Sequence, residues 1–132
     1  MKKILVVDNH KSILDVMETI LIQQGYEVVT ASSYKTILPN IYKNQPDIII
    51  LDVMLNNEDG RIICQQLKEN NRTKNICIIL FSGSSYKLKD YKNYNADGFL
   101  EKPFNLEDLL EVLEVCKKSS EKIKVLKNNG EK

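Results

Sequence analysis

The sequence lacks the features of a cysteine-based metal site, a disulfide framework or a membrane protein. Its three cysteines, Cys64, Cys77 and Cys116, are widely spaced and form no C-x-x-C pair, so we expect three free thiols that pack as small core residues. The longest apolar run, Ile76 to Phe81, has only the length of a strand. No run is long enough for a signal peptide or a membrane span, which predicts a reduced, cytoplasmic location.

The sequence also lacks an excess of charge of either sign. Nineteen Lys and Arg residues stand against eighteen Asp and Glu residues, a net charge of +1, which gives no electrostatic reason to expect binding to nucleic acid or to a membrane. No repeat, linker or low-complexity segment precedes Ser119. The length of 132 residues suits one domain with one core. We expect that domain over residues 1–118, with 119–132 extending the last helix or beginning a tail or linker.

What the chain does contain is an alternation of short apolar runs with longer segments of helical period. Residues 48–51 are apolar without alternation, which is typical of a strand buried on both faces. Pro39 lies in the second expected helix and would kink it, unless the helix begins late with Pro39 in its first turn. The expected strands are 4–7, 26–31, 47–51, 76–81 and 98–100, and the expected helices are one ending before Gly25, then 33–44, 59–70, 86–93 and one beginning near Asn105.

Five such strand–helix units predict the α/β class, with one parallel sheet and helices on both faces. Because crossover connections are right-handed, few topologies remain, and the flavodoxin-like strand order 2-1-3-4-5 is the one we expect. In such sheets the functional crevice lies beyond the carboxyl ends of the strands, near the switch in strand order.

Polar residues stand at that edge. Asp8 and Asn9 follow the first strand, Asp52 the third and Ser82 the fourth, and Lys102 comes after the fifth. Each alone is compatible with an ordinary turn or a solvated surface position. Together they would line one small crevice, because the strands that carry them are expected to be neighbours.

This combination of side chains suits phosphoryl transfer to a carboxylate. Asp8 and Asp52 could hold Mg²⁺, which is commonly bound through one or two carboxylates and phosphate oxygens. The ion would neutralise the phosphoryl oxygens while Asp52 attacks in line. Lys102 could pair with Asp52 and then with the phosphate, and Ser82 could donate a hydrogen bond to a phosphoryl oxygen.

At these residues the chain resembles the response-regulator receiver domain of two-component signalling, in the CheY-like superfamily. The resemblance is ordered, runs from Lys2 to about Lys118, and rests on five segments in register. These are Ile4-Leu5-Val6-Val7-Asp8-Asn9, Leu51-Asp52-Val53-Met54-Leu55, Asp59-Gly60, Phe81-Ser82-Gly83 and Ala96-Asp97-Gly98-Phe99-Leu100-Glu101-Lys102-Pro103-Phe104.

The resemblance implies a role for each matching residue. Asp52 matches the phospho-accepting aspartate, Ser82 the switch hydroxyl, and Lys102 the active-site lysine, which in the family precedes a cis proline, here Pro103. Phe99 matches the aromatic side chain that turns inward on activation.

The resemblance also implies a magnesium site. Asp8 and Asn9 match the acidic pair that binds Mg²⁺, and the backbone carbonyl of Met54 matches the third protein ligand beside Asp52. Activation in the family reshapes the surface of the fourth helix, the fifth strand and the fifth helix.

The sequence departs from the family pattern at several positions. Asn9 stands where the family usually has a second acid, and because hard cations favour charged oxygen ligands, we predict weakened Mg²⁺ binding and slower phosphorylation. Asn56 replaces a frequent proline, Gly83 replaces the usual alanine, and the fourth helix is short. His10, the only histidine, is expected at the surface or the beginning of a helix, with metal or phosphate contact as the alternative.

Three functional classes remain open. The favoured one is a phosphorylatable switch with no enzyme activity beyond its own Mg²⁺-dependent phosphorylation and dephosphorylation. The second is a degenerate receiver that binds partner proteins without phosphorylation, supported by Asn9. The third is a small enzyme of similar topology, such as a flavoprotein or an aspartate-dependent phosphatase.

The resemblance implies partners for the switch. They are a sensor histidine kinase or phosphotransfer protein, a downstream protein or output domain, and a second copy in a homodimer. The chain is expected to be either a stand-alone regulator or a receiver cut from a longer protein.

Overall fold

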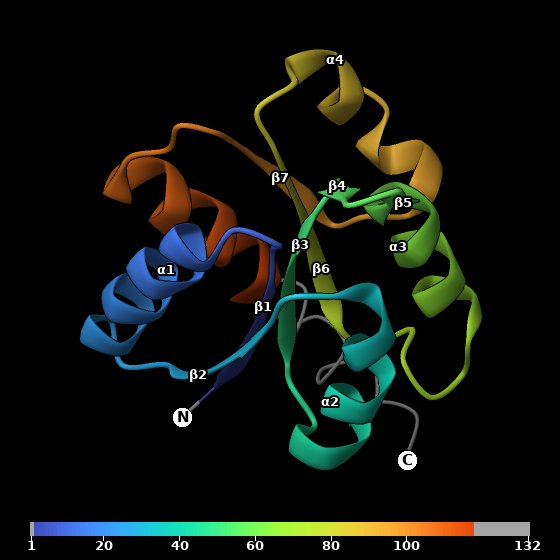
Figure 1. Ribbon diagram of the computed structural model, residues 1–132, viewed down its shortest axis with the longest axis horizontal. Helices are drawn as coiled ribbons and strands as arrows, with labels where there is room; N and C mark the ends of the chain where they lie inside the picture. Colours follow the sequence, from blue (N-terminus) through green and yellow to red (C-terminus); the bar gives the residue numbers. More distant parts are fainter. Residues whose placement is uncertain (1, 118–132) are drawn as a thin grey trace, which may run out of the picture.

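Five parallel strands form the centre of the protein, as the computed structural model shows for residues 2–117 (Figure 1). They are β1 (Lys3–Val7), β2 (Glu27–Ala31), β3 (Ile48–Asp52), β6 (Cys77–Ser82) and β7 (Gly98–Glu101). The sheet order is β2-β1-β3-β6-β7, which is the order 2-1-3-4-5 when only these five strands are counted. The predicted fold class and topology are confirmed, and each strand lies within one residue of its predicted bounds at either end.

The central strands are buried on both faces because their apolar residues do not alternate with polar ones. Every residue of β3 and of β6 is buried. Alternate side chains enter two separate cores: Ile49 and Ile78 face one, and Ile50 and Ile79 face the other.

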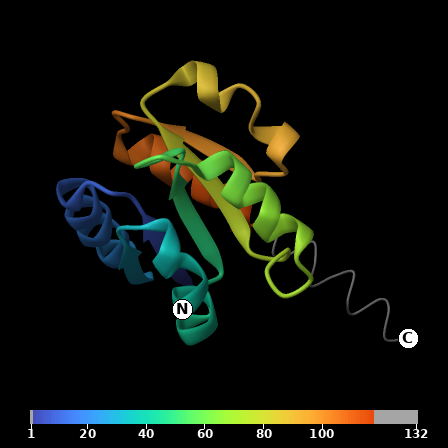
Figure 2. The same cartoon turned by 45° about the vertical axis from the view of Figure 1, so that its right-hand side comes forward.

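Helices cover both cores. The first core is closed by α2 (Ile37–Asn44), α3 (Gly60–Glu69) and α4 (Ser85–Leu88), and the second by α1 (Lys11–Gln23) and the helix at residues 106–117. Figure 2 shows the sheet from another side, with α4 above the carboxyl ends of the strands.

The second helix begins late, as one of the two expectations for Pro39 predicted. A 3₁₀ turn (Tyr34–Thr36) precedes α2, so Pro39 falls in the first turn of the helix, where a missing N–H costs little. The last helix begins as predicted, because the side-chain oxygen of Asn105 accepts a hydrogen bond of 2.8 Å from the backbone N–H of Asp108.

The chain between β3 and α3, and the fourth helix, differ from the prediction. Residues after β3 form a small hairpin of β4 (Met54–Leu55) and β5 (Glu58–Asp59), which was not predicted. Asn56 lies in its turn with φ 54°, a left-handed conformation that proline cannot adopt. The helix predicted at 86–93 is broken into α4 and a 3₁₀ turn (Tyr91–Tyr94).

The prediction of three free cysteines was wrong. Cys77 at the beginning of β6 and Cys116 in the last helix form a disulfide, with their Cα atoms 5.6 Å apart, and only Cys64 is a free, buried thiol. Their separation of 39 residues hid the pair, since only the packing of that helix on the sheet brings them together.

Two further expectations concerned the carboxyl-terminal residues and membrane-spanning segments. The predicted helix extension or tail at 119–132 lies outside the described residues. Among residues 2–117, no helix is long and apolar enough to cross a bilayer.

Candidate functional site

Three of the predicted site residues meet at the carboxyl edge of the sheet. Asp8 directly follows β1, Asp52 ends β3, and Lys102 directly follows β7. Both carboxylates are almost fully buried, with 0% and 2% of their residues exposed. The Nζ atom of Lys102 lies 2.8 Å from Oδ2 of Asp8 and 3.6 Å from Oδ2 of Asp52.

Lys102 is held by more than its ion pairs. Its ammonium lies 4.6 Å from the centre of the Phe81 ring, a distance at which a cation is attracted to the face of an aromatic ring. Its backbone N–H donates to the carbonyl of Ser82. The peptide bond between Lys102 and Pro103 is cis, as the resemblance implied.

Asp52 occupies an environment that disfavours its charge. Burial is the largest cause that raises the pKa of this carboxyl, and the charge of Asp8 raises it further. The backbone N–H of Met54, 3.1 Å from Oδ1, and the ammonium of Lys102 oppose that rise. Together these effects raise the pKa of Asp52 above its ordinary value. A cation bound beside Asp52 would therefore stabilise its charged form.

Asn9 presents an unsatisfied acceptor. Its Oδ1 atom is buried and has no hydrogen-bond partner, the only such side-chain atom among the described residues. Its Nδ2 atom donates to Oδ1 of Asn56 at 3.1 Å, which orients the amide. A buried oxygen without a partner, on the residue that directly follows the buried Asp8, is costly unless a cation or another donor satisfies it.

These groups fit a hard divalent cation. Two carboxylates and one amide oxygen are ligands that Mg²⁺ takes in proteins, and the ion would satisfy the amide oxygen and offset the proximity of the carboxylates. The predicted ligands remain Asp8, Asn9, Asp52 and the backbone carbonyl of Met54. The side chain of Met54 is exposed and contacts the ammonium of Lys87.

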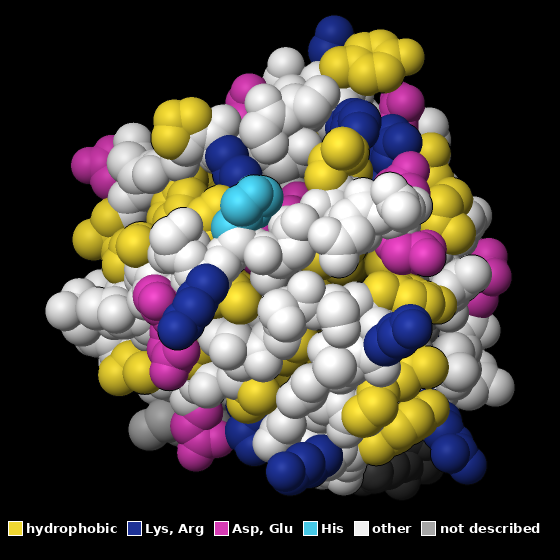
Figure 3. Space-filling view, viewed as in Figure 1, with side chains coloured by type: hydrophobic (Ala, Val, Ile, Leu, Met, Phe, Trp, Pro, Cys, Tyr) yellow, Lys and Arg dark blue, Asp and Glu magenta, His cyan; other side chains and the backbone are white. Residues whose placement is uncertain are grey.

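His10 lies closer to this site than we expected. Its Nδ1 atom is 3.1 Å from Oδ1 of Asp8, although its ring is 63% exposed. Figure 3 shows the single histidine of the chain on the surface of this side of the molecule. The surface position and the beginning of a helix are confirmed, since His10 stands at the N-cap position of α1, but the sequence did not indicate the contact with Asp8.

Gly60 packs directly against the backbone of Asp52, a contact that the sequence analysis did not predict. A Cβ atom at this position would lie 2.1 Å from the backbone oxygen of Asp52, so only glycine fits. Its N–H donates to the carbonyl of Val53 at 2.7 Å. The signal available in the sequence was a glycine directly after Asp59, which caps α3 by accepting from the N–H of Arg61.

Ser82 and Phe99 occupy positions that suit a switch. Ser82 is buried at the end of β6, and its Oγ accepts a hydrogen bond of 3.0 Å from the N–H of Ser84. Phe99 points outward, 44% exposed, with its ring centre 5.1 Å from that of Tyr91. Phe99 also lines a hollow of about 380 Å³ that reaches Val112 and Val115 on the last helix.

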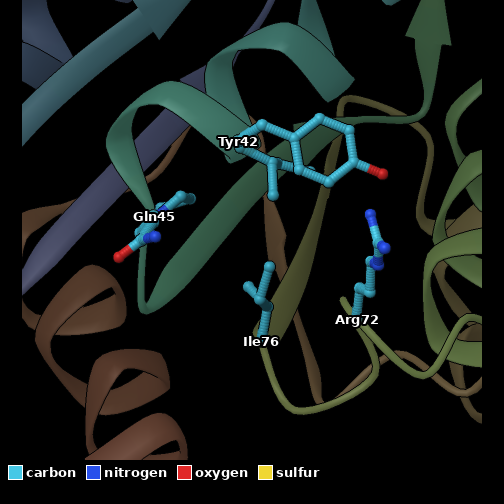
Figure 4. Close-up of a pocket in the computed structure, with 6 residues that line it drawn as sticks. Tyr42, Gln45, Arg72 and Ile76 are labelled. Atoms are coloured by element: carbon cyan, nitrogen blue, oxygen red, sulfur yellow. The ribbon is translucent and has the colours of Figure 1, made fainter.

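A separate hollow of about 330 Å³ lies at the amino-terminal edge of the sheet (Figure 4). It contains Tyr42, Gln45, Arg72 and Ile76, together with Ile41 and Pro46. None of the described residues that line it carries a carboxylate, and it lies at the end of the strands away from Asp52.

A parallel sheet of this order with two buried carboxylates and a lysine at its carboxyl edge defines a CheY-like α/β protein. The model of the family described as response regulator receiver domain matches residues 4–114. The chain belongs to this family.

Individual relatives agree. The chain is 35% identical over 104 residues to the alkaline phosphatase synthesis transcriptional regulatory protein PhoP of Bacillus subtilis (strain 168), which covers 79% of this chain and 43% of PhoP. It therefore spans less than half the length of that relative.

Among solved structures, the chemotaxis protein CheY4 of Vibrio cholerae has a TM-score of 0.78 and 33% identity, covering 86% of this chain and 97% of CheY4. A CheY-like response regulator receiver domain protein from Methanospirillum hungatei JF-1 has a TM-score of 0.81 and 27% identity, covering 92% of this chain and 98% of that protein.

Proposed function

We propose that this receiver domain accepts a phosphoryl group on Asp52 from a histidine kinase or a phosphotransfer protein. The observation that carries the proposal is the buried Asp52 carboxylate, which lies within 3.6 Å of the ammonium of Lys102 and beside Asp8. In the transfer, the P–N bond of the donor's phosphohistidine breaks, an O–P bond to Asp52 forms, and the imidazole of the donor leaves.

The chain's own residues prepare this step. The N–H of Met54 holds one oxygen of Asp52, which leaves the other free to attack. Lys102 can exchange Asp8 for a phosphoryl oxygen by a short movement of its flexible side chain. Ser82 can release the N–H of Ser84 and donate its hydroxyl proton to the phosphate.

Magnesium is the cofactor we propose, held by Asp8, Asn9, Asp52 and the carbonyl of Met54. When bound, it supplies positive charge that neutralises the phosphoryl oxygens. Because Asn9 lacks a charge, we expect Mg²⁺ affinity to rise on Asn9→Asp, measured by calorimetry on both proteins; equal affinities would contradict the assignment of Asn9 as a ligand.

The output of the switch is proposed to be a change in the surface formed by α4, β7 and the helix at 106–117. Movement of Ser82 toward the phosphate would vacate space into which Phe99 can turn from its exposed position against Tyr91. A downstream protein or output domain, or a second copy of the chain, would bind this surface. We place the protein in the cytoplasm, where a histidine kinase obtains ATP, and propose no further enzyme activity.

Acetyl phosphate with Mg²⁺ tests the proposal. The intact protein should gain the mass of one phosphoryl group, and Asp52→Asn should not. Asp59→Asn is the matched control, because Asp59 is an acid near the same edge that pairs with Arg61 instead, and it should still be phosphorylated.

A second candidate function is favoured by Asn9: a receiver that binds partners without phosphorylation. It predicts no mass gain and no spectral change with beryllofluoride in the wild type. Both responses, lost together in Asp52→Asn, would exclude it.

A further inference from the structure

We propose that His10 is an additional ligand of the metal site and shifts its preference from Mg²⁺ toward borderline transition ions such as Co²⁺. This inference rests on the metal site of the proposed function and adds a nitrogen ligand to its oxygen ligands. Compared with the acidic pair that the family usually has, the sequence Asp8-Asn9-His10 offers an amide oxygen and an imidazole in place of one charged oxygen ligand.

The position of the imidazole carries the proposal. His10 occupies the N-cap position of α1 without a side-chain capping hydrogen bond, and its backbone N–H donates to Oδ1 of Asp8 at 2.9 Å. The same carboxylate oxygen lies 3.1 Å from Nδ1 of the ring. The backbone contact therefore holds the residue while the ring nitrogen faces the site instead of capping the helix.

The spacing brings three ligand atoms close enough to share one ion after small side-chain movements. One ligand atom from each of Asp8, His10 and Asp52 can be chosen so that all lie within 4.8 Å of one another. Neighbouring ligands of an octahedral ion, each about 2.1 Å from it, are about 3.0 Å apart. The separation of 3.1 Å between His10 and Asp8 thus matches two adjacent coordination positions.

The burial of the groups around His10 favours a bound metal ion over a hydrogen bond between His10 and Asp8 alone. Both carboxylates are buried, and the amide oxygen of Asn9 is buried without a partner. A hydrogen bond between His10 and Asp8 leaves that oxygen unsatisfied, whereas an ion that Asn9 joined in binding would satisfy it.

The ligand set decides which ion gains most. Imidazole suits transition ions, while carboxylate and carbonyl oxygens alone suit Mg²⁺. An amide at position 9 in place of a charged acid would weaken Mg²⁺ binding. The imidazole of His10 would offset that loss of affinity only for ions that accept a nitrogen ligand. The ratio of Co²⁺ to Mg²⁺ affinity is therefore the quantity that His10 controls.

The test compares untagged wild type with His10→Ala by calorimetry. Co²⁺ affinity should fall about tenfold in His10→Ala, while Mg²⁺ affinity changes less than about twofold. Equal loss for both ions, or no loss for Co²⁺, would overturn the proposal. Asp52→Asn, which removes a ligand common to both ions, should weaken both.

Proton NMR of the Co²⁺-loaded wild type provides a second readout that needs no variant. Because His10 is the only histidine, one set of strongly shifted imidazole C–H resonances should appear, and its absence overturns the proposal. The experiments separate failure of this inference from failure of the proposed function. If His10→Ala leaves Co²⁺ affinity unchanged while Asp52 is still phosphorylated, only the role of His10 as a ligand is overturned. If no divalent ion binds the wild type, the metal site itself is overturned.

Discussion

Lys102 makes its shorter ion pair with Asp8 and not with Asp52, which the sequence had led us to expect as its partner. Its Nζ atom lies 2.8 Å from Oδ2 of Asp8 and 3.6 Å from Oδ2 of Asp52. The lysine therefore neutralises the fully buried carboxylate of Asp8 and leaves Asp52, the proposed phosphoryl acceptor, more loosely paired. A carboxylate that is not tightly paired with a lysine would be easier for an incoming phosphoryl group to reach.

Replacing Lys102 by Met should lower the stability of the domain. The change leaves Asp8 buried without its cation, and we expect a loss of about 2 kcal/mol in the free energy of unfolding, since the lysine is itself only partly buried. Lys102→Arg, which keeps the charge, should lose less than half of this. Urea denaturation without divalent ions measures both, and equal stability of Lys102→Met and wild type would contradict the pairing with Asp8.

Asp52→Asn should stabilise the metal-free protein at neutral pH. Burial raises the pKa of Asp52 above the unfolded value of 3.8, so the folded state holds a proton more tightly than the unfolded state. Stability linked to this proton is complete below the unfolded pKa and is lost as pH rises through the folded pKa.

At pH 7 with EDTA, Asp52→Asn should therefore be more stable than wild type, by on the order of 1 kcal/mol. The difference should vanish below about pH 4. Urea titrations at several pH values measure it, and a wild type that is the more stable protein at pH 7 would refute the prediction.

Gly60→Ala should damage both the fold and the site. Its Cβ would lie 2.1 Å from the backbone oxygen of Asp52 and 2.9 Å from Cα of Val53, so the backbone must shift, at about 2–3 kcal/mol. Gly83→Ala is the matched control, because its nearest atom, on Lys102, is 3.9 Å away. Thermal unfolding should separate the two variants clearly; similar melting temperatures would argue against the clash.

Lys68→Met should destabilise the domain by about 2 kcal/mol. Its ammonium lies 2.6 Å from Oδ2 of Asp97 and also donates to the carbonyl of Ile76, so α3 is tied to the segments that precede β6 and β7. The change would leave a mostly buried carboxylate without its cation. Lys117→Met removes only an exposed pair with Glu114 and should cost under about 0.5 kcal/mol; equal effects on denaturant midpoints would contradict this ranking.

Reduction of the disulfide should lower stability. The bridge between Cys77 and Cys116 closes a loop with a sequence separation of 39, for which chain entropy predicts about 4 kcal/mol. Burial raises the pKa of the Cys64 thiol to about 12, so Cys64 is a poor competitor for exchange.

Protein purified under oxidising conditions should show one titratable thiol when unfolded, and three after reduction. Reductant should leave the stability of Cys77→Ser unchanged. Three thiols before reduction would contradict the bridge.

The fold was largely predictable because its determinants are local. Unbroken apolar residues at 48–51 predict a doubly buried strand, and alternation with helical segments predicts parallel pairing. Parallel strands place their carboxyl ends at one edge, so a polar residue at each strand end was enough to predict that Asp8, Asp52 and Lys102 meet.

By itself, then, the sequence determined the strands, their order and the edge that carries the carboxylates, because side-chain period and strand direction are properties of short segments. Tertiary structure alone decided that Lys102 pairs with Asp8, that His10 faces the same carboxylate, and that Cys77 meets Cys116. Each of these contacts depends on the position and orientation of a side chain after the backbone has folded, to within about one ångström, and residue type and spacing carry no such information.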